Sequence, residues 1–244
     1  MSKTKTWAGF EKYADIVYPN SSLVEVIAET RFPVALSVEC KRDCFYEKIK
    51  KDFPIITFPL IQNNSIIAYQ PYQFSSIDGS EWILLAVNKF SYHTRKYSGH
   101  KKFGNKYLKL ADLFSKVFSV AKFDRIGWRY INLIPFVRES GVIPISRFFN
   151  MHLKLPETIP DDYQYLSATF VVNAGSGSIV ARLTPFIKDD GMEAFFLDID
   201  YGVMGNLTFE NMKTNLEEAH RYTRGCFESL ITDNYRQFLR GDTL

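Results

Sequence analysis

The segment RIGWRYIN, residues 125–132, carries side chains suited to binding an anion. If this segment is a β-strand, side chains two positions apart point to the same face, so Arg125 and Arg129 project together with Gly127 between them. Two guanidinium groups at this spacing can bind a phosphate or a carboxylate through paired hydrogen bonds. Because Gly127 has no side chain, a ligand or another backbone could approach closely there. The motif is therefore a candidate anion-binding site.

The same motif also has a structural interpretation. Each arginine would form an ion pair with a carboxylate inside the fold, and Glu25 and Glu29 of an earlier segment are the candidates. Tyr130 and Asn132 point to the opposite face of the strand and share both interpretations, as anion-binding or structural residues. Because buried charges are generally paired, we favour the structural interpretation.

A second candidate is the segment 89–109, in which basic residues alternate with aromatic ones and no acidic residue occurs between Glu81 and Asp112. Single-stranded nucleic acid is bound in this way, with phosphates on lysine and arginine and bases stacked on aromatic rings. The alternative is a solvated bend between a strand and a helix, anchored to the core by its aromatic residues, and the balance slightly favours this bend. The candidate nucleic-acid-binding residues are Arg95, Lys96, Tyr97, Lys101, Lys102, Phe103 and Lys106.

Asp198 and Asp200 would share one face of a strand and are weak candidates for a metal site. Two such carboxylates can bind Mg²⁺, and a third one from Asp189 or Asp190 would suit a nuclease that uses two metal ions. Two aspartates at this spacing are common by chance, and a solvent-facing sheet carries polar residues in any case. We therefore expect no bound metal and no cofactor.

Other catalytic patterns are poorly supported by the sequence. The histidines, at positions 93, 100, 152 and 220, lie far apart along the chain and lack the spacing of a zinc site. The three cysteines, at positions 40, 44 and 226, are too few and odd in number for a disulfide framework. Nucleophile-elbow and dinucleotide-binding motifs are also missing from the sequence. Whether the protein is an enzyme stays open, and the balance leans against catalysis.

The composition is that of a globular protein, with 46% hydrophobic and 23% charged residues among 244. The formal net charge of +3 is too small to indicate a polyanionic partner by itself, so such an argument depends on local clusters. The first residues are polar, and no apolar run approaches the roughly 20 residues that cross a bilayer. We expect a cytoplasmic protein that does not associate with membranes.

The periodicity of apolar residues predicts strands that are grouped ahead of long helices. The predicted strands cover residues 23–32, 65–74, 81–94, 123–137, 165–174, 178–187 and 194–203, with an extended segment at 34–39. The predicted helices cover residues 40–53, 106–123, 145–151 and 207–239. Gly-containing connections at 77–80 and 175–178 predict two hairpins.

This order of elements favours an α+β fold with antiparallel strands and helices on one face of the sheet. The chain divides near residue 140 into an N-terminal half, 1–140, and a C-terminal half, 141–244, which can still form a single domain. Each half runs through antiparallel strands to one long helix, which indicates a weak internal duplication. We expect the long amphipathic C-terminal helix to offer an interface to a partner.

Three segments, SSLVEVIAETRF (21–32), NKFSYHTRKYSG (88–99) and FDRIGWRYINLIPF (123–136), occur in an order that resembles a sporadically distributed prokaryotic family of unknown function. That family has a V-E-V strand near the N-terminus, a tyrosine-containing segment ahead of a helix and an R-I-G-x-R-Y-I-N strand. The resemblance implies no known activity. The family's distribution is similar to that of accessory genes in defence and toxin–antitoxin loci.

Together these observations predict a non-catalytic interaction protein with a protein partner, as an accessory or immunity factor. The alternative is a nucleic-acid-binding module that uses the segment 89–109. A metal-dependent nuclease at Asp198 and Asp200 is a third and weaker hypothesis. The sequence does not give the oligomeric state.

Overall fold

The computed structural model describes residues 7, 16–57, 71–151, 156–160 and 162–242. Most of the strand predicted at 65–74, as well as His152, lies outside these residues. No helix in the described part of the chain is long and apolar enough to cross a membrane.

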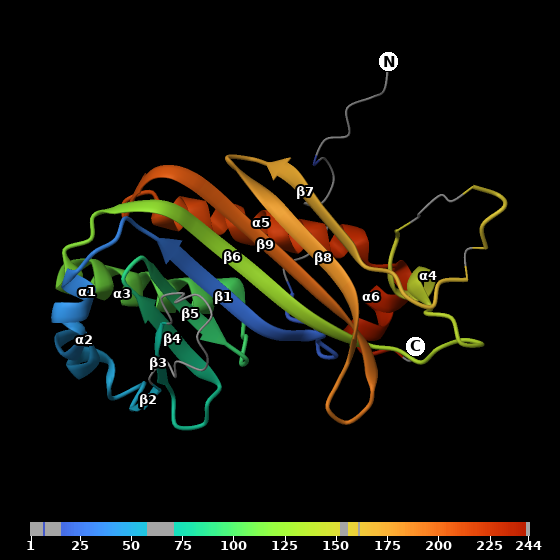
Figure 1. The fold of residues 1–244 in the computed structure, drawn as a ribbon, viewed down its shortest axis with the longest axis horizontal. Coiled ribbons are helices and arrows are strands. Elements are labelled where there is room, and N and C mark those ends of the chain that lie inside the picture. The colour runs from blue at the N-terminus through green and yellow to red at the C-terminus, as the bar shows by residue number, and fades with distance from the viewer. Residues whose placement is uncertain (1–6, 8–15, 58–70, 152–155, 161, 243–244) are drawn as a thin grey trace, which may run out of the picture. The chain divides into compact units, whose positions relative to one another are not determined.

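The protein has an α+β fold, as predicted, with a nine-stranded sheet in the order β2-β3-β4-β5-β1-β6-β9-β8-β7 (Figure 1). The strands are β1 (Leu23–Arg31), β2 (Ile55–Thr57), β3 (Tyr72–Ser75), β4 (Glu81–Ala86), β5 (Lys89–Thr94), β6 (Lys122–Pro135), β7 (Ala168–Ala174), β8 (Gly177–Ile187) and β9 (Glu193–Thr208). The helices are α1 (Ser37–Cys40), α2 (Arg42–Ile49), α3 (His100–Phe118), α4 (Ile145–Phe148), α5 (Met212–Leu230) and α6 (Asp233–Arg240).

Both predicted hairpins are confirmed. Strands β7 and β8 pair antiparallel up to Ala174 and Gly177, across the glycine-containing turn at 175–176. Strands β3 and β4 also pair antiparallel, from Tyr72 opposite Leu85 to Ser75 opposite Trp82. Positive φ angles at Gly79 (64°) and Gly175 (56°) explain why glycine occurs in both turns.

Several predicted elements are wrong in their extent. The strand predicted over 81–94 is two strands, β4 and β5, which pair antiparallel with each other. The helix predicted from residue 106 begins at His100, because the buried residues Phe103 and Tyr107 already follow its apolar face. The segment 89–109 is therefore the strand β5, a short loop and the first half of α3 rather than one solvated bend. Residues 34–39 are not extended, since the chain turns after the Ala35 N–H donates to the Val87 carbonyl and then enters α1.

The single C-terminal helix predicted over 207–239 is also wrong. Strand β9 continues to Thr208, and the rest divides into α5 and α6. The break comes at Thr232, whose hydroxyl accepts a hydrogen bond from the Tyr235 N–H and caps α6. Gly225 lies inside α5 without interrupting it.

Compact packing divides the described residues into two units that interleave along the sequence. Unit 1 holds those within Met1–Val24, Tyr130–Tyr201 and Arg221–Leu244, and unit 2 holds those within Glu25–Arg129 and Gly202–His220. The halves 1–140 and 141–244 remain a prediction about the organisation of the sequence.

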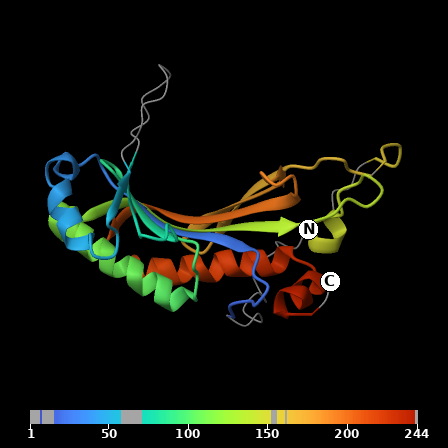
Figure 2. The same cartoon turned by 90° about the horizontal axis from the view of Figure 1, so that it is seen from below.

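The core of unit 2 is aromatic and lies between α3 and the neighbouring strands, on the face that Figure 2 shows covered by this helix. Phe90 of β5 stacks on Phe114 of α3 at 4.8 Å between ring centroids. Two residues further along β5, Tyr92 stacks on Phe103 at 5.1 Å between ring centroids. Because successive side chains of a strand point to alternate faces, Ser91 and His93 point to the opposite face of the sheet.

Unit 1 is centred on Glu228, a fully buried carboxylate of α5. It accepts a hydrogen bond from the Tyr18 hydroxyl at 2.8 Å and pairs with Arg224 at 2.7 Å and Arg236 at 2.9 Å. Burial, reinforced by Glu228, raises the pKa of Tyr18 to about 12. These contacts connect the N-terminal segment, α5 and α6 through one charge cluster.

We predict that Glu228→Ala lowers the free energy of unfolding by about 3–5 kcal/mol, because it leaves two arginines without their buried partner. The matched control is Glu217→Ala on the same helix, where an exposed carboxylate lies 3.9 Å from Lys213 and contributes about 0.5 kcal/mol or less. Urea denaturation followed by circular dichroism measures both. Equal losses in the two variants would contradict a stabilising role for the cluster.

Candidate functional sites

Arg125 occupies the centre of the polar face of unit 2. The β6 side chains alternate as predicted, with Ile126 and Trp128 buried on the opposite face. The Arg125 Nη1 donates to the Glu29 Oε1 at 3.1 Å, so the structural interpretation is confirmed for this arginine. Glu29 also lies 2.8 Å from Arg31 and 3.9 Å from Lys89. A carboxylate of the protein itself therefore occupies the place of a bound anion.

The two glycines beside Arg125 explain why its side chain can lie flat on the sheet. A Cβ atom at Gly127 would lie 2.3 Å from the Arg125 Nη1, and one at Gly202 would lie 2.7 Å from its Nε. The space that the sequence suggested for a ligand at Gly127 is thus filled by the guanidinium of Arg125. These glycines are required by a close approach, not by an unusual backbone conformation.

The other residues of the RIGWRYIN motif are also engaged within the protein. Arg129 has interaction partners in the fold. Tyr130 and Asn132 are buried on the opposite face of β6. Asn132 accepts a hydrogen bond from the Ser22 hydroxyl at 3.2 Å and donates to the Leu197 carbonyl at 3.4 Å. These contacts give Asn132 a structural role.

We predict that Gly127→Ala destabilises the protein by about 1–3 kcal/mol, because the new methyl group displaces the Arg125 guanidinium from Glu29. In an Arg125→Ala background the same substitution should cost less than about 0.5 kcal/mol, since the side chain in conflict is gone. Urea denaturation of the two single variants and the double variant gives their free energies of unfolding, which form a double-mutant cycle. An additive result would show that the glycine is needed for another reason.

Next to this cluster the structure forms a hydrogen-bonded chain of serine, histidine and glutamate that the sequence did not reveal. The Ser91 Oγ lies 2.9 Å from the His93 Nε2, and the His93 Nδ1 lies 2.7 Å from the Glu25 Oε1. These are the residue types, order and distances of a catalytic triad. Glu25 reaches His93 because β1 pairs with β5, which is distant in sequence.

The surroundings of this chain do not suit an accessible nucleophile. Ser91 is only 1% exposed, and its strand pairs on both sides, with β1 and with β4. The Trp82 ring stacks on the His93 ring at 5.0 Å, and the Arg95 guanidinium lies 5.0 Å from the Trp82 ring centroid. Acyl transfer needs a reachable hydroxyl and free N–H donors for the oxyanion. The geometry instead fits a fixed histidine within a sheet.

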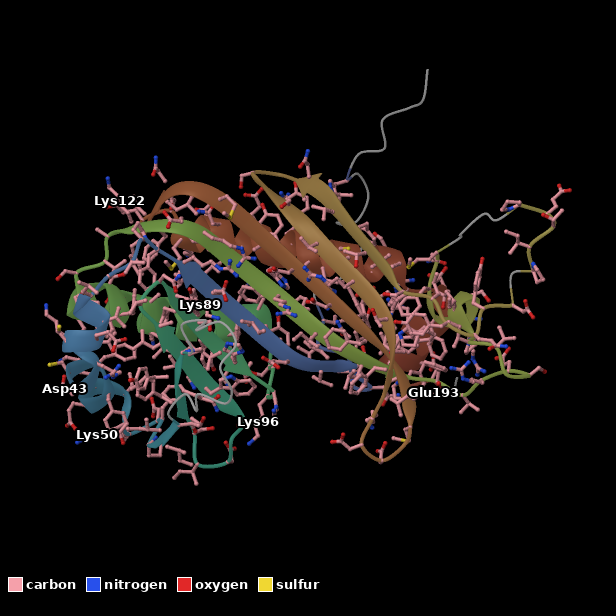
Figure 3. The ribbon with its side chains drawn as sticks, in the orientation of Figure 1. Asp43, Lys50, Lys89, Lys96, Lys122 and Glu193 are labelled. Atoms are coloured by element: carbon pink, nitrogen blue, oxygen red, sulfur yellow. The ribbon has the colours of Figure 1, made fainter. Side chains whose placement is uncertain are left out.

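The basic segment 89–109 is partly neutralised in space. Lys96 lies 2.5 Å from Asp78, Lys106 lies 2.5 Å from Glu81, and Lys89 is near Glu29. The bond from Lys96 holds the pKa of the Asp78 carboxyl well below its usual range. Figure 3 shows Lys89 and Lys96 apart, toward opposite ends of β5.

The aromatic residues of the segment anchor it, as the structural alternative proposed. Phe103 is 4% exposed and Tyr97 contacts its edge at 6.1 Å between ring centroids. Lys101 and Lys102 remain exposed and have no carboxylate partner among the described residues. Both lie in the first turn of α3, which has no acidic residue and whose N-cap, Gly99, makes no side-chain bond. Positive charge there opposes the helix dipole.

Part of the segment lines a cavity of about 710 Å³ in unit 2. Lys96, Lys102, Phe103 and Lys106 meet there with residues that follow α2 and with the β3–β4 turn. The full lining is Lys51, Asp52, Ser76, Ile77, Asp78, Ser80, Glu81, Tyr92, Thr94, Lys96, Ser98, Lys102, Phe103 and Lys106. These residues are distant in the sequence, so the sequence did not predict that they line one cavity.

The candidate metal residues are not gathered into a site. Asp198 is buried, and its carboxylate accepts a hydrogen bond from Arg182 at 2.9 Å. Asp200 also interacts within the protein. Asp190 accepts a hydrogen bond from the Met192 N–H in a turn. Across the described residues, no group of three or more metal-binding side chains comes together.

Two histidines that are far apart in sequence meet in unit 2. The His100 and His220 rings stack at 4.1 Å with an interplanar angle of 6°. They border a second cavity, of about 460 Å³, together with Trp128. Their distance along the chain gave no sign of this contact, which α3 and α5 bring about.

Comparison with protein-family models finds no match, and no curated protein matches the chain.

Proposed function

We propose that the protein is a non-catalytic binding protein that recognises a polypeptide partner along the edge of β7. The observation that carries this proposal is the exposure of Val171 and Val172, at 64% and 36%, on a strand that ends the described sheet order. Neighbouring residues of a strand point to opposite faces, so both faces of this edge are apolar. An open edge with apolar side chains is suited to pairing with an added strand.

The surroundings of β7 support the same proposal. Tyr165 precedes the strand and is exposed, as are Phe186 and Ile187 at the end of β8. At the other end, the Trp7 indole N–H donates to the Asn173 carbonyl at 2.7 Å, so this strand already accepts one hydrogen bond from outside the ladder. The apolar stripe of the C-terminal helices is less suitable than the sequence indicated, since Met212, Leu216 and Tyr235 are buried.

The biological setting is proposed from the resemblance alone. We place the chain in the sporadically distributed prokaryotic family and propose a cytoplasmic accessory or immunity factor. We also propose that 1–140 and 141–244 are related by duplication, supported by the order of strands before α3 and before α5.

We predict that Val171→Lys with Val172→Lys abolishes capture of a stoichiometric protein partner in low-salt purification from the native host, because charged side chains block strand addition. Val137→Lys is the matched control, since Val137 is an exposed valine of unit 1 away from β7. Mass spectrometry identifies the partner, and cross-linking locates its contacts. A partner that the double variant still captures would exclude the β7 edge.

We propose nucleic-acid binding as the second candidate function, because Lys101 and Lys102 are adjacent in the first turn of α3 and are exposed without carboxylate partners among the described residues. Such ammonium groups bind phosphates without reading the sequence. The rings of Phe103 and Tyr107 are buried and do not serve as stacking surfaces. Binding would therefore be mainly electrostatic.

For this candidate we predict that Lys101→Glu with Lys102→Glu removes binding of a short single-stranded oligonucleotide at low salt. Removal of each lysine alone should reduce the slope of log affinity against log salt by about 1. Fluorescence anisotropy measures both effects. Lys122→Glu, at an exposed lysine that starts β6 (Figure 3), is the control and should bind as the wild type does. Equal binding by all variants would reject this function.

A further inference from the structure

We infer that the 710 Å³ cavity of unit 2 binds a small phosphorylated sugar. The cavity combines ammonium groups, hydroxyl groups and fixed carboxylates, which are the groups that recognise a phosphate and a polyol on one molecule. Its volume is within the range of about 300–1,000 Å³ that is usual for small-molecule sites. This inference is independent of the protein partner proposed above.

The phosphate would be held by Lys51 and Lys102. Both are exposed and line the cavity, and neither has a carboxylate partner among the described residues. They come from segments that are distant in sequence, after α2 and in α3, so the cavity holds two available positive charges from two elements. Lys96 and Lys106 also line it, but each is already paired with a carboxylate.

The two ion pairs fix the positions of Asp78 and Glu81, two of the three carboxylates in the described lining of the cavity. Asp78 accepts four hydrogen bonds, from Lys96, from the hydroxyls of Ser76 and Ser80 and from the Ser80 N–H. Glu81 accepts from Lys106 and, at 2.5 Å, from the buried Tyr92 hydroxyl. A carboxylate has about four acceptor positions, so those of Asp78 are filled, whereas a sugar hydroxyl can still donate to Glu81. A carboxylate held in this way favours a hydroxylated ligand over inorganic phosphate.

The remaining lining supports a sugar. Thr94 and Ser98 add hydroxyl groups that can donate or accept. Ile77 is exposed and adds apolar surface, which suits the C–H groups of a sugar ring. Asp78 and Glu81 would repel a phosphate placed near them, so the phosphate is expected where it contacts Lys51 and Lys102.

The test is isothermal titration calorimetry of the full chain with ribose 5-phosphate, inorganic phosphate and ribose as probes. We expect ribose 5-phosphate to bind at least tenfold more tightly than inorganic phosphate or ribose, since it engages both the lysines and the groups that bind sugar hydroxyls. Lys51→Glu with Lys102→Glu should weaken it more than tenfold. Lys101→Glu, with the same charge change one residue outside the cavity lining, should leave the affinity within twofold.

Three results would overturn the inference: no binding of ribose 5-phosphate, equal affinity for inorganic phosphate, or full affinity in the Lys51 and Lys102 double variant. The single variants Lys51→Met and Lys102→Met each remove one charge at an exposed position, so they test the site even where the double variant fails to fold. The Lys51 and Lys101 variants also separate this site from nucleic-acid binding. Lys51 lines the cavity but is not a candidate for nucleic-acid binding. Lys101 is a candidate for nucleic-acid binding but does not line the cavity.

Discussion

The guanidinium of Arg125, lying across Gly127 and Gly202 toward Glu29, is the interaction on which the polar face of unit 2 depends. A charged group in the middle of a sheet is costly unless it is paired and hydrogen-bonded. The two glycines let the arginine reach its partner without leaving the sheet surface. The position of the Arg125 guanidinium explains an acid at position 29 and residues without a side chain at 127 and 202. The cations at 31 and 89 lie around the same carboxylate.

That arrangement also determines where binding can take place. Beside it, Ser91, His93 and Glu25 satisfy one another, and Trp82 covers the histidine. A face whose polar groups are already paired gains little from a ligand, because binding would exchange one set of hydrogen bonds for another. Available groups occur elsewhere, at Lys51 and Lys102 in the cavity and at the apolar edge of β7. The triad-like chain is therefore best understood as part of the fold.

The sequence predicted most strands and both hairpins, because alternation and turn residues are local signals. The pairing of Arg125 with Glu29 was expected from the general rule that buried charges are paired, not from a local pattern. Other contacts between distant segments were missed. The contact of His93 with Glu25 requires β1 to pair with β5 across the whole α1–β4 region, and no local pattern contains that register. The end of α5 was missed for a different reason: a threonine cap at 232 outweighed continuous apolar periodicity.

The basic segment shows most clearly why charge along the chain differs from charge in space. No acid occurs between Glu81 and Asp112, yet Asp78, Glu81 and Glu29 approach its lysines because β5 pairs with β4 on one side and with β1 on the other. Each such pair is worth little in stability at an exposed site, but it removes a charge from the field that a polyanion would meet. Among the described residues, Lys101 and Lys102 at the start of α3 and Lys51 after α2 have no carboxylate partner. Lys51 and Lys102 both line the cavity of unit 2, and this placement is better suited to a small anion than to a long one.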